Sequence, residues 1–122
     1  MRVLIVEPGQ TPREADIDGS LKGMQKVVGG LIEALYPFEE SVALICNEES
    51  KLDELPYNRA LYGPDGKPYD VIAGTFFVCG LTEANFGPLS PELMDFAKKK
   101  FHMPESFACV DQKVVVLPES AN

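Results

Sequence analysis

Short apolar runs separated by turn signals fill the first half of the chain, and they predict strands. Residues 2–7 form a β-branched run that ends at a proline-glycine pair, which indicates a buried strand and its turn. Residues 13–17 alternate weakly between apolar and polar positions and predict an antiparallel partner for this first strand. Residues 31–36 and 41–46 flank a short loop and predict a β-hairpin.

The second half of the chain holds the strongest strand signal. Residues 69–81 are apolar on both faces and rich in β-branched and aromatic side chains, which predicts one continuous central strand. Gly74 in its middle weakens a strand unless another group packs closely against the backbone there. Residues 113–117 predict a last strand at a sheet edge, flanked by the single charge of Lys113. An edge with so little protection could pair across a homodimer.

Two segments carry helix signals with well-formed ends. Ser20 offers an N-cap before apolar residues at helical spacing, and Gly29-Gly30 ends this first helix. The second helix begins at Ser90, with a proline at its first position and a glutamate in its first turn. Pro104 marks its limit.

The order of these elements predicts the fold class. Hairpins outnumber crossovers that could join parallel strands, so we expect an α+β fold. The predicted architecture is a mostly antiparallel sheet of about five to six strands with two main helices packed on it. No linker, repeat or low-complexity segment interrupts the pattern, which predicts a single domain over residues 1–122.

Composition and charge exclude several classes of protein. The chain has 122 residues, 45% of them hydrophobic, and a net charge of −8. Such an acidic chain lacks the clustered lysines and arginines that bind phosphate backbones, so we expect no direct nucleic-acid binding. No apolar run approaches the roughly 18 residues that a membrane span needs, and no signal-peptide pattern is present. We therefore expect a cytoplasmic protein without membrane contact.

The cysteines and the single histidine match no metal or catalytic pattern. The chain has three cysteines, an odd number that would leave one unpaired in any disulfide scheme. Their positions, Cys46, Cys79 and Cys109, lack the short paired spacing of a zinc site. Cys46 and Cys79 lie within apolar runs, which indicates buried reduced thiols. His102 stands at a predicted helix end without a nucleophile cue. We expect no metal, no cofactor and no assigned catalytic residue, and the question of an enzyme stays open with the balance against it.

Acidic residues concentrate in one stretch of the chain. Residues 38–54 hold six acidic residues and one basic residue, Lys51, for a net charge of −5. Three interpretations remain open: a solvated face, a surface that attracts a basic protein partner, and a site for a hard cation such as calcium or magnesium. The spacing lacks the ligand order and central glycine of an EF-hand loop.

Asn58 and Arg59 form a polar pair after Pro56, which stiffens the chain. We expect the pair on a loop, where the planar fork of the guanidinium would suit a carboxylate or a phosphate. Alternatively, Arg59 forms a salt bridge with Glu48 or Asp53, and Asn47 and Asn58 hold turns through side-chain to backbone hydrogen bonds.

The chain resembles an uncharacterised family, the domain of unknown function 3846. The resemblance covers roughly residues 1–100, which leaves residues 101–122 as a C-terminal extension with the edge strand. It rests on an ordered series: Met24-Gln25, Val28-Gly29-Gly30, Ile32-Glu33, Cys46-Asn47-Glu48-Glu49, Leu55-Pro56, Asn58-Arg59 and residues 70–75. The resemblance implies a cytoplasmic protein of phages, conjugative elements and gut Firmicutes, and it implies no activity or cofactor.

Polar or special residues coincide with this series at six positions, which are our candidate binding residues: Asn47, Glu48, Asn58, Arg59, Gly74 and Thr75. The favoured function is a non-catalytic accessory or protein-interaction module whose acidic segment meets a basic partner. One alternative is a small-molecule-binding protein or enzyme that uses Glu48 and Arg59. Another is an acidic mimic of DNA that blocks restriction proteins.

Overall fold

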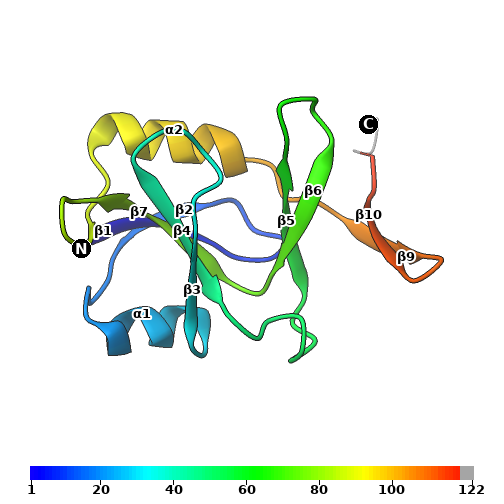
Figure 1. Ribbon diagram of the computed structural model, residues 1–122, viewed down its shortest axis with the longest axis horizontal. Coiled ribbons are helices and arrows are strands. Elements are labelled where there is room, and N and C mark those ends of the chain that lie inside the picture. Colours follow the sequence, from blue (N-terminus) through cyan, green and yellow to red (C-terminus); the bar gives the residue numbers. More distant parts are fainter. Residues whose placement is uncertain (119–122) are drawn as a thin grey trace.

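A computed structural model describes residues 1–118 of the chain. Its centre is a six-stranded antiparallel sheet in the order β2-β1-β7-β4-β3, with the short β8 paired to β7 (Figure 1). The predicted pairing of residues 13–17 with the first strand and the predicted hairpin of residues 31–46 are both confirmed. The strands span Arg2–Val6 (β1), Arg13–Asp16 (β2), Ile32–Leu35 (β3), Val42–Asn47 (β4), Phe76–Leu81 (β7) and Phe86–Gly87 (β8).

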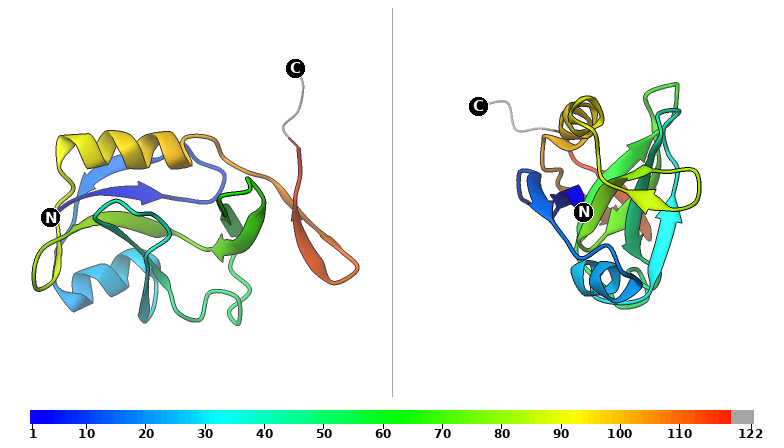
Figure 2. Two further views of the ribbon diagram at one scale, coloured as in Figure 1. Left: turned by 45° about the horizontal axis from the view of Figure 1, so that its top comes forward. Right: turned by 90° about the vertical axis from the view of Figure 1, so that its left-hand side faces the viewer.

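Two helices cover opposite faces of this sheet (Figure 2). The first, α1, spans Leu21–Val28, and the Ser20 hydroxyl accepts a hydrogen bond from the Gly23 N–H at its start. The second, α2, spans Pro91–Phe101 and is capped in the same way by Ser90. Both predicted N-caps and the helix end at Gly29 are confirmed, and with them the α+β class.

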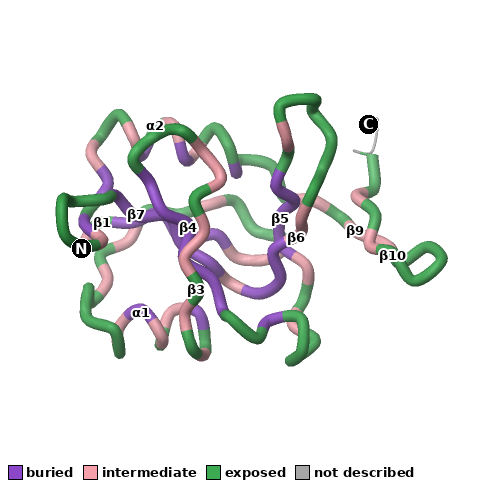
Figure 3. Tube along the Cα trace, in the orientation of Figure 1, coloured by how far each residue is buried: buried purple, intermediate pink, exposed green. Residues whose placement is uncertain are grey.

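The core is divided by the sheet into two layers. Side chains such as Leu4, Leu44 and Phe76 face α2, whereas Val3, Ile45 and Phe77 face α1. The alternation follows from the two-residue period of a strand. Because β1, β4 and β7 are covered on both faces, their residues are almost all buried, as Figure 3 shows in purple.

The segment expected to form one strand over residues 69–81 is two strands. It breaks at Gly74, whose φ of 77° lies in the left-handed region that glycine adopts without strain. The first part, β6 (Pro68–Ala73), pairs with β5 (Tyr57–Tyr62) in a separate two-stranded sheet. The expected loop position of Asn58 and Arg59 is therefore wrong, because both residues lie inside β5. The apolar run masked the break because its hydrophobicity is continuous across Gly74.

A second small hairpin follows α2 and extends from one end of the molecule (Figures 1 and 2). It consists of β9 (Phe107–Val110) and β10 (Lys113–Val116). Asp111 and Gln112 form its turn with φ values of 51° and 65°, the backbone that tight hairpins favour. The predicted last strand thus exists, but it pairs with β9 and not with the main sheet.

Candidate functional site

Asn58 and Arg59 lie at the centre of a buried polar network. The Asn58 side-chain amide donates to the carbonyls of Val6, at the end of β1, and Gly74, at distances of 2.9 and 2.8 Å. Its oxygen accepts a hydrogen bond from Arg59 at 2.9 Å. One asparagine therefore joins β5 to β1 and to the break between β6 and β7.

Arg59 uses all of its donors inside the protein. The guanidinium donates twice to the carbonyl of Phe101 at the end of α2, once to the carbonyl of Gln10, and to the backbone and side-chain oxygens of Asn58. A guanidinium has five N–H donors, and five hydrogen bonds account for all of them. The side chain is 1% exposed. No donor is left for an external carboxylate or phosphate.

The expected salt bridge of Arg59 is also wrong. Arg59 forms no ion pair with Glu48 or Asp53; the guanidinium instead caps the carbonyl end of α2, where a cation complements the helix dipole. Burial lowers the pKa of Arg59, and the nearby Glu105 opposes that shift. The arginine remains charged, because its ordinary pKa is far above neutral.

Gly74 and Thr75 belong to the same region. The Gly74 N–H donates to the Pro56 carbonyl at 2.7 Å, and a Cβ at this position would lie 2.8 Å from Leu55 Cδ1. Thr75 is half-buried beside it. Gly74 therefore serves the close approach of two segments, and the network as a whole holds the β5–β6 hairpin against the main sheet.

Asn47 is the last residue of β4, and its side chain also joins separate segments of the chain. Its amide donates to the Val28 carbonyl at 3.3 Å, and its oxygen accepts from the Glu49 N–H at 2.8 Å. The side chain is buried against Gly30. Asn47 thus connects the end of α1 to the start of the loop that follows β4.

Glu48 is the only one of the six candidate residues that is exposed, and it lies on a different part of the molecule from Arg59. It lines a small cavity of about 110 Å³ between β3, the loop after β4, and β6. We call this cavity the polar groove; its lining residues are Glu33, Leu35, Cys46, Asn47, Glu48, Ser50, Lys51, Leu52, Asp70, Val71 and Ile72. The structure brings Asn47 and Glu48 together here, and it separates them from Asn58, Arg59, Gly74 and Thr75.

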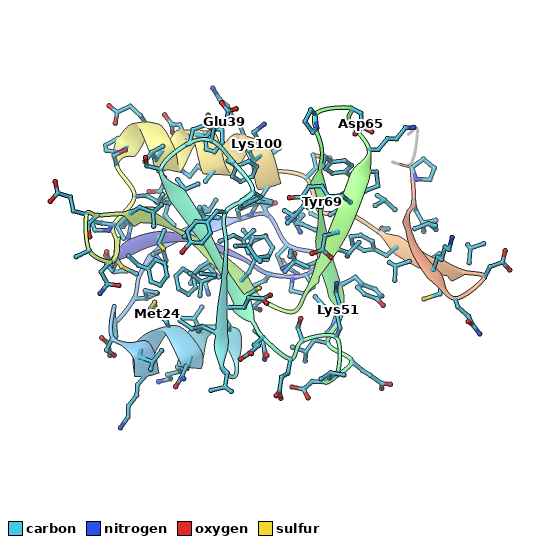
Figure 4. All side chains as sticks on the ribbon, viewed as in Figure 1. Met24, Glu39, Lys51, Asp65, Tyr69 and Lys100 are labelled. Atoms are coloured by element: carbon cyan, nitrogen blue, oxygen red, sulfur yellow. The ribbon has the colours of Figure 1, made fainter. Side chains whose placement is uncertain are left out.

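The charge of the polar groove is negative. Lys51 is paired with Asp70 at 2.9 Å, so these two charges compensate each other (Figure 4 labels Lys51). Within residues 1–118, Glu33 and Glu48 form no ion pair. Two uncompensated carboxylates therefore border the cavity.

The acidic segment of residues 38–54 does not form one surface. Glu39 and Glu40 lie in the turn before β4, next to α2, whereas residues 48–54 follow the other end of that strand. Six residues of extended chain separate the two groups by about 20 Å. We call residues 48–54 the acidic loop; its carboxylates are those of Glu48, Glu49, Asp53 and Glu54.

Cys46 forms the floor of the polar groove and is not a reactive thiol. Burial, followed by the charge of Glu33, raises its pKa to about 12. The thiol lies 3.8 Å from a Glu33 carboxylate oxygen. A thiolate is the nucleophilic form of cysteine, so this environment keeps Cys46 unreactive.

A larger cavity adjoins the polar groove. It has a volume of about 300 Å³ between β6 and β10, and it shares Lys51, Asp70 and Val71 with the groove. Tyr57, Tyr69, Val114 and Val116 make this part more apolar. Sequence reasoning missed Glu33, Asp70 and Tyr69. Only the tertiary packing of β3 and β6 places Glu33 and Asp70 beside Glu48, and Tyr69 in the adjoining cavity. The single lysine within the acidic segment was the one local signal.

Neither a metal site nor a membrane helix is seen in the described chain. Among residues 1–118, no three histidine, cysteine or acidic side chains are arranged to hold a metal ion. No helix in that range has the length and apolar character needed to cross a membrane. The expectations of no cofactor and no metal stay predictions.

The comparisons with known proteins place the chain in a family. The fold is an α+β domain with one helix on each face of an antiparallel sheet, and its polar network is structural. The model of a family described as a domain of unknown function (DUF3846) matches residues 1–102, so the chain belongs to this family. No curated protein and no solved structure matches the chain. The β9–β10 hairpin lies beyond the matched residues.

Proposed function

We propose that this protein is a non-catalytic interaction module that binds a basic segment of a protein partner through the acidic loop. The observation that carries the proposal is that the carboxylates of the acidic loop are not paired with cations. Within residues 1–118, Glu48, Glu49, Asp53 and Glu54 have no cationic partner, and Lys51 is paired with Asp70 outside the loop. A cluster of uncompensated charges attracts an oppositely charged surface and accelerates its association.

An apolar side chain beside the acidic loop supports a protein partner. Leu52, at the middle of the loop, is 82% exposed. A basic peptide carries long methylene stems beside its charges, and such stems cover apolar surface. A small inorganic cation would make no use of Leu52. The setting we propose, a cytoplasmic accessory protein of phages or other mobile elements, rests on the family resemblance alone.

The small-molecule or enzyme alternative has less support. It requires Arg59 to hold an anion close to Glu48, but all five guanidinium donors are bonded to oxygens of the protein. Glu48 is exposed on the acidic loop, whereas a carboxylate that acts in general acid–base catalysis needs a partly buried site.

The DNA-mimic alternative requires a continuous strip of negative charge. Duplex DNA carries one charge for about every 1.7 Å of its axis. Here the acidic residues of the segment 38–54 lie at both ends of β4, with buried residues between them. The spacing is too sparse for mimicry.

The test is a binding titration with a basic probe. The probe is a short capped peptide in which lysine alternates with valine, labelled for fluorescence anisotropy. We expect saturable binding that weakens steeply with added salt, because the contact is electrostatic. The quadruple variant Glu48→Lys, Glu49→Lys, Asp53→Lys, Glu54→Lys should lose binding at least about tenfold.

A second quadruple variant provides the matched control. Glu39→Lys, Glu40→Lys, Glu83→Lys, Asp95→Lys makes the same change in net charge at exposed positions outside the loop. It should bind the peptide much better than the loop variant does. Equal losses in both variants would mean that net charge alone attracts the peptide, and the acidic loop would have no special role.

A further inference from the structure

The two edges of the main sheet differ in how they are protected. The outer strand β2 carries three charged residues, Arg13, Glu14 and Asp16, and each is engaged in an ion pair. Asp16 pairs with Arg2 at 3.1 Å, and Glu14 pairs with Lys98 of α2. Charged side chains of this kind prevent a further strand from pairing with an edge. The β2 edge is closed.

The β3 edge lacks this protection. Its four residues include one charge, Glu33, which has no ion pair within residues 1–118. In the part of the chain that the structure describes, no strand pairs with β3 on the side away from β4. Figure 2 shows β3, in cyan, at the margin of the molecule in its right-hand view.

The hydrogen-bond pattern identifies which backbone groups are free. The Leu31 carbonyl accepts the Glu48 N–H at 2.8 Å, so this pair belongs to the hydrogen-bonded set of the ladder. Such pairs alternate along antiparallel strands. Glu33 and Leu35 therefore bond to β4, and the N–H and C=O groups of Ile32 and Ala34 point away from it.

Exposed apolar side chains flank this open edge. Leu31, just before β3, is 56% exposed, and Tyr36, just after it, is 60% exposed. Large apolar side chains at both ends of an unpaired strand provide contacts for a segment lying along it.

One face of β3 leads into the polar groove. Glu33 and Leu35 point to the α2 side of the sheet and line the groove with Glu48 and Asp70. A strand added beside β3 would present alternate side chains to this acidic face. Basic side chains at those positions would meet the carboxylates of Glu33 and Glu48.

We propose that the free edge of β3 binds an extended basic segment of a partner protein by strand addition. The proposal rests on the proposed function and specifies its geometry. Backbone hydrogen bonds to Ile32 and Ala34 give affinity, and the polar groove selects lysine or arginine at alternate positions. Charge complementarity argues against a second copy of this chain, because antiparallel pairing of β3 with itself would bring the Glu33 carboxylates of the two copies together.

The first test measures amide protection on the intact protein. The probe is the capped lysine–valine peptide, and the readout is hydrogen exchange of individual β3 amides. We expect the Ile32 and Ala34 amides to become protected when the peptide binds. The Glu33 and Leu35 amides should change little, because they already donate to β4. Binding without protection of Ile32 and Ala34 would overturn strand addition.

The second test removes one outward-facing donor. In Ala34→Pro the lost N–H is one that points away from β4, so the main sheet keeps its hydrogen bonds. We expect affinity for the peptide to fall by roughly tenfold or more. The matched control is Asp16→Pro, which removes an outward-facing N–H from the β2 edge and should leave affinity unchanged.

The outcomes separate this proposal from the proposed function. Loss of binding in the acidic-loop variant but not in Ala34→Pro would keep the interaction module and refute the β3 edge. No saturable binding of the peptide at low salt would overturn both. If Ala34→Pro proves unfolded, the exchange data on the unmodified chain decide. Self-association that protects Ile32 and Ala34 without peptide would replace the basic segment with a second copy.

Discussion

At the scale of single residues, Arg59 is a cation buried among carbonyl oxygens. Its contacts include the last carbonyl of α2 and the loop carbonyl of Gln10. A buried charge is tolerated only when its hydrogen bonds are complete. Asn58 contributes two of those five bonds while it also serves Val6 and Gly74, so the pair acts as one unit.

Replacing Asn58 tests this unit directly. Asn58→Ala removes the hydrogen bonds to the buried carbonyls of Val6 and Gly74 and leaves one buried Arg59 donor without a partner. We expect the free energy of unfolding to fall by about 2–4 kcal/mol, measured by urea denaturation. The exposed variant Glu48→Gln should change it by less than about 0.5 kcal/mol. A similar small change in Asn58→Ala would show that water satisfies these groups.

Two features restrict the residue at position 74, and Gly29 shares only one of them. Gly74 has a φ of 77° and lies close to Leu55, whereas Gly29 has a φ of 82° and open space around it. In both alanine variants we expect the free energy of unfolding to fall by about 1 kcal/mol, because alanine is strained in the left-handed backbone conformation. In Gly74→Ala we expect the free energy of unfolding to fall by about 1 kcal/mol more, because the added Cβ would displace Leu55. Equal losses in thermal unfolding would show that the approach of Leu55 is easily relieved.

The three thiols should differ in reactivity. Burial raises the pKa of Cys46 and of Cys79 to about 12, whereas Cys109 is exposed in the β9–β10 hairpin. At mildly alkaline pH we expect a thiol-specific colorimetric reagent to modify one cysteine in the folded protein and all three in denaturant. Rapid modification of two or more thiols without denaturant would contradict the buried positions. Cys109→Ser identifies the reactive one.

At the scale of elements, Glu105 attaches the C-terminal hairpin to the rest of the molecule. Its carboxylate accepts the backbone N–H of Ala60 at 2.9 Å and the hydroxyl of Tyr62. The rings of Tyr57 and Phe107 add a contact with centroids 5.7 Å apart. A two-stranded hairpin is marginal alone, so these contacts set the position of β9 and β10.

The bond between Tyr62 and Glu105 should be visible in a pH titration. Burial, followed by the hydrogen bond to Glu105, raises the pKa of Tyr62 to about 12. A raised tyrosine pKa means that the stabilisation is intact below the unfolded value of about 10 and is lost as pH rises towards 12. Tyrosinate absorbance should show a late ionisation that Tyr62→Phe removes and Glu105→Gln moves to lower pH. An unchanged titration in Glu105→Gln would refute the coupling.

Local signals accounted for much of the fold. The caps at Ser20 and Ser90 and the hairpin of residues 31–46 depend on neighbours in the sequence, and all were predicted. The position of Arg59 was not, because its partners include the Phe101 carbonyl, 42 residues away. The polar groove likewise needs Glu33 and Asp70 to meet through tertiary packing. Gly74 was the one local signal, within an otherwise uninterrupted apolar run, that the strand predicted over residues 69–81 is broken.

At the scale of the whole molecule, the excess of negative charge is only partly compensated. Five ion pairs are seen within residues 1–118, and four of them involve residues of β2. The acidic loop lies away from them. The surface is thus divided into a closed, charge-paired edge and an open, acidic one.

This imbalance predicts how stability responds to salt. Sodium chloride screens the repulsion among acidic side chains in a chain of net charge −8. The surface ion pairs are exposed and contribute little. We expect the melting temperature to rise by a few degrees between low and physiological ionic strength. A fall in melting temperature would mean that the ion pairs around β2 outweigh the repulsion.

The carbonyl of Phe101 has a consequence for the order of events during synthesis. Arg59 emerges from the ribosome before α2 does, and its main hydrogen-bond acceptor is the last residue of that helix. Until residue 101 is available, burying the guanidinium would leave two of its five donors without a partner. The β5–β6 hairpin therefore cannot settle on the nascent sheet by itself. The chain commits to its final shape late, when the end of α2 arrives to close the assembly.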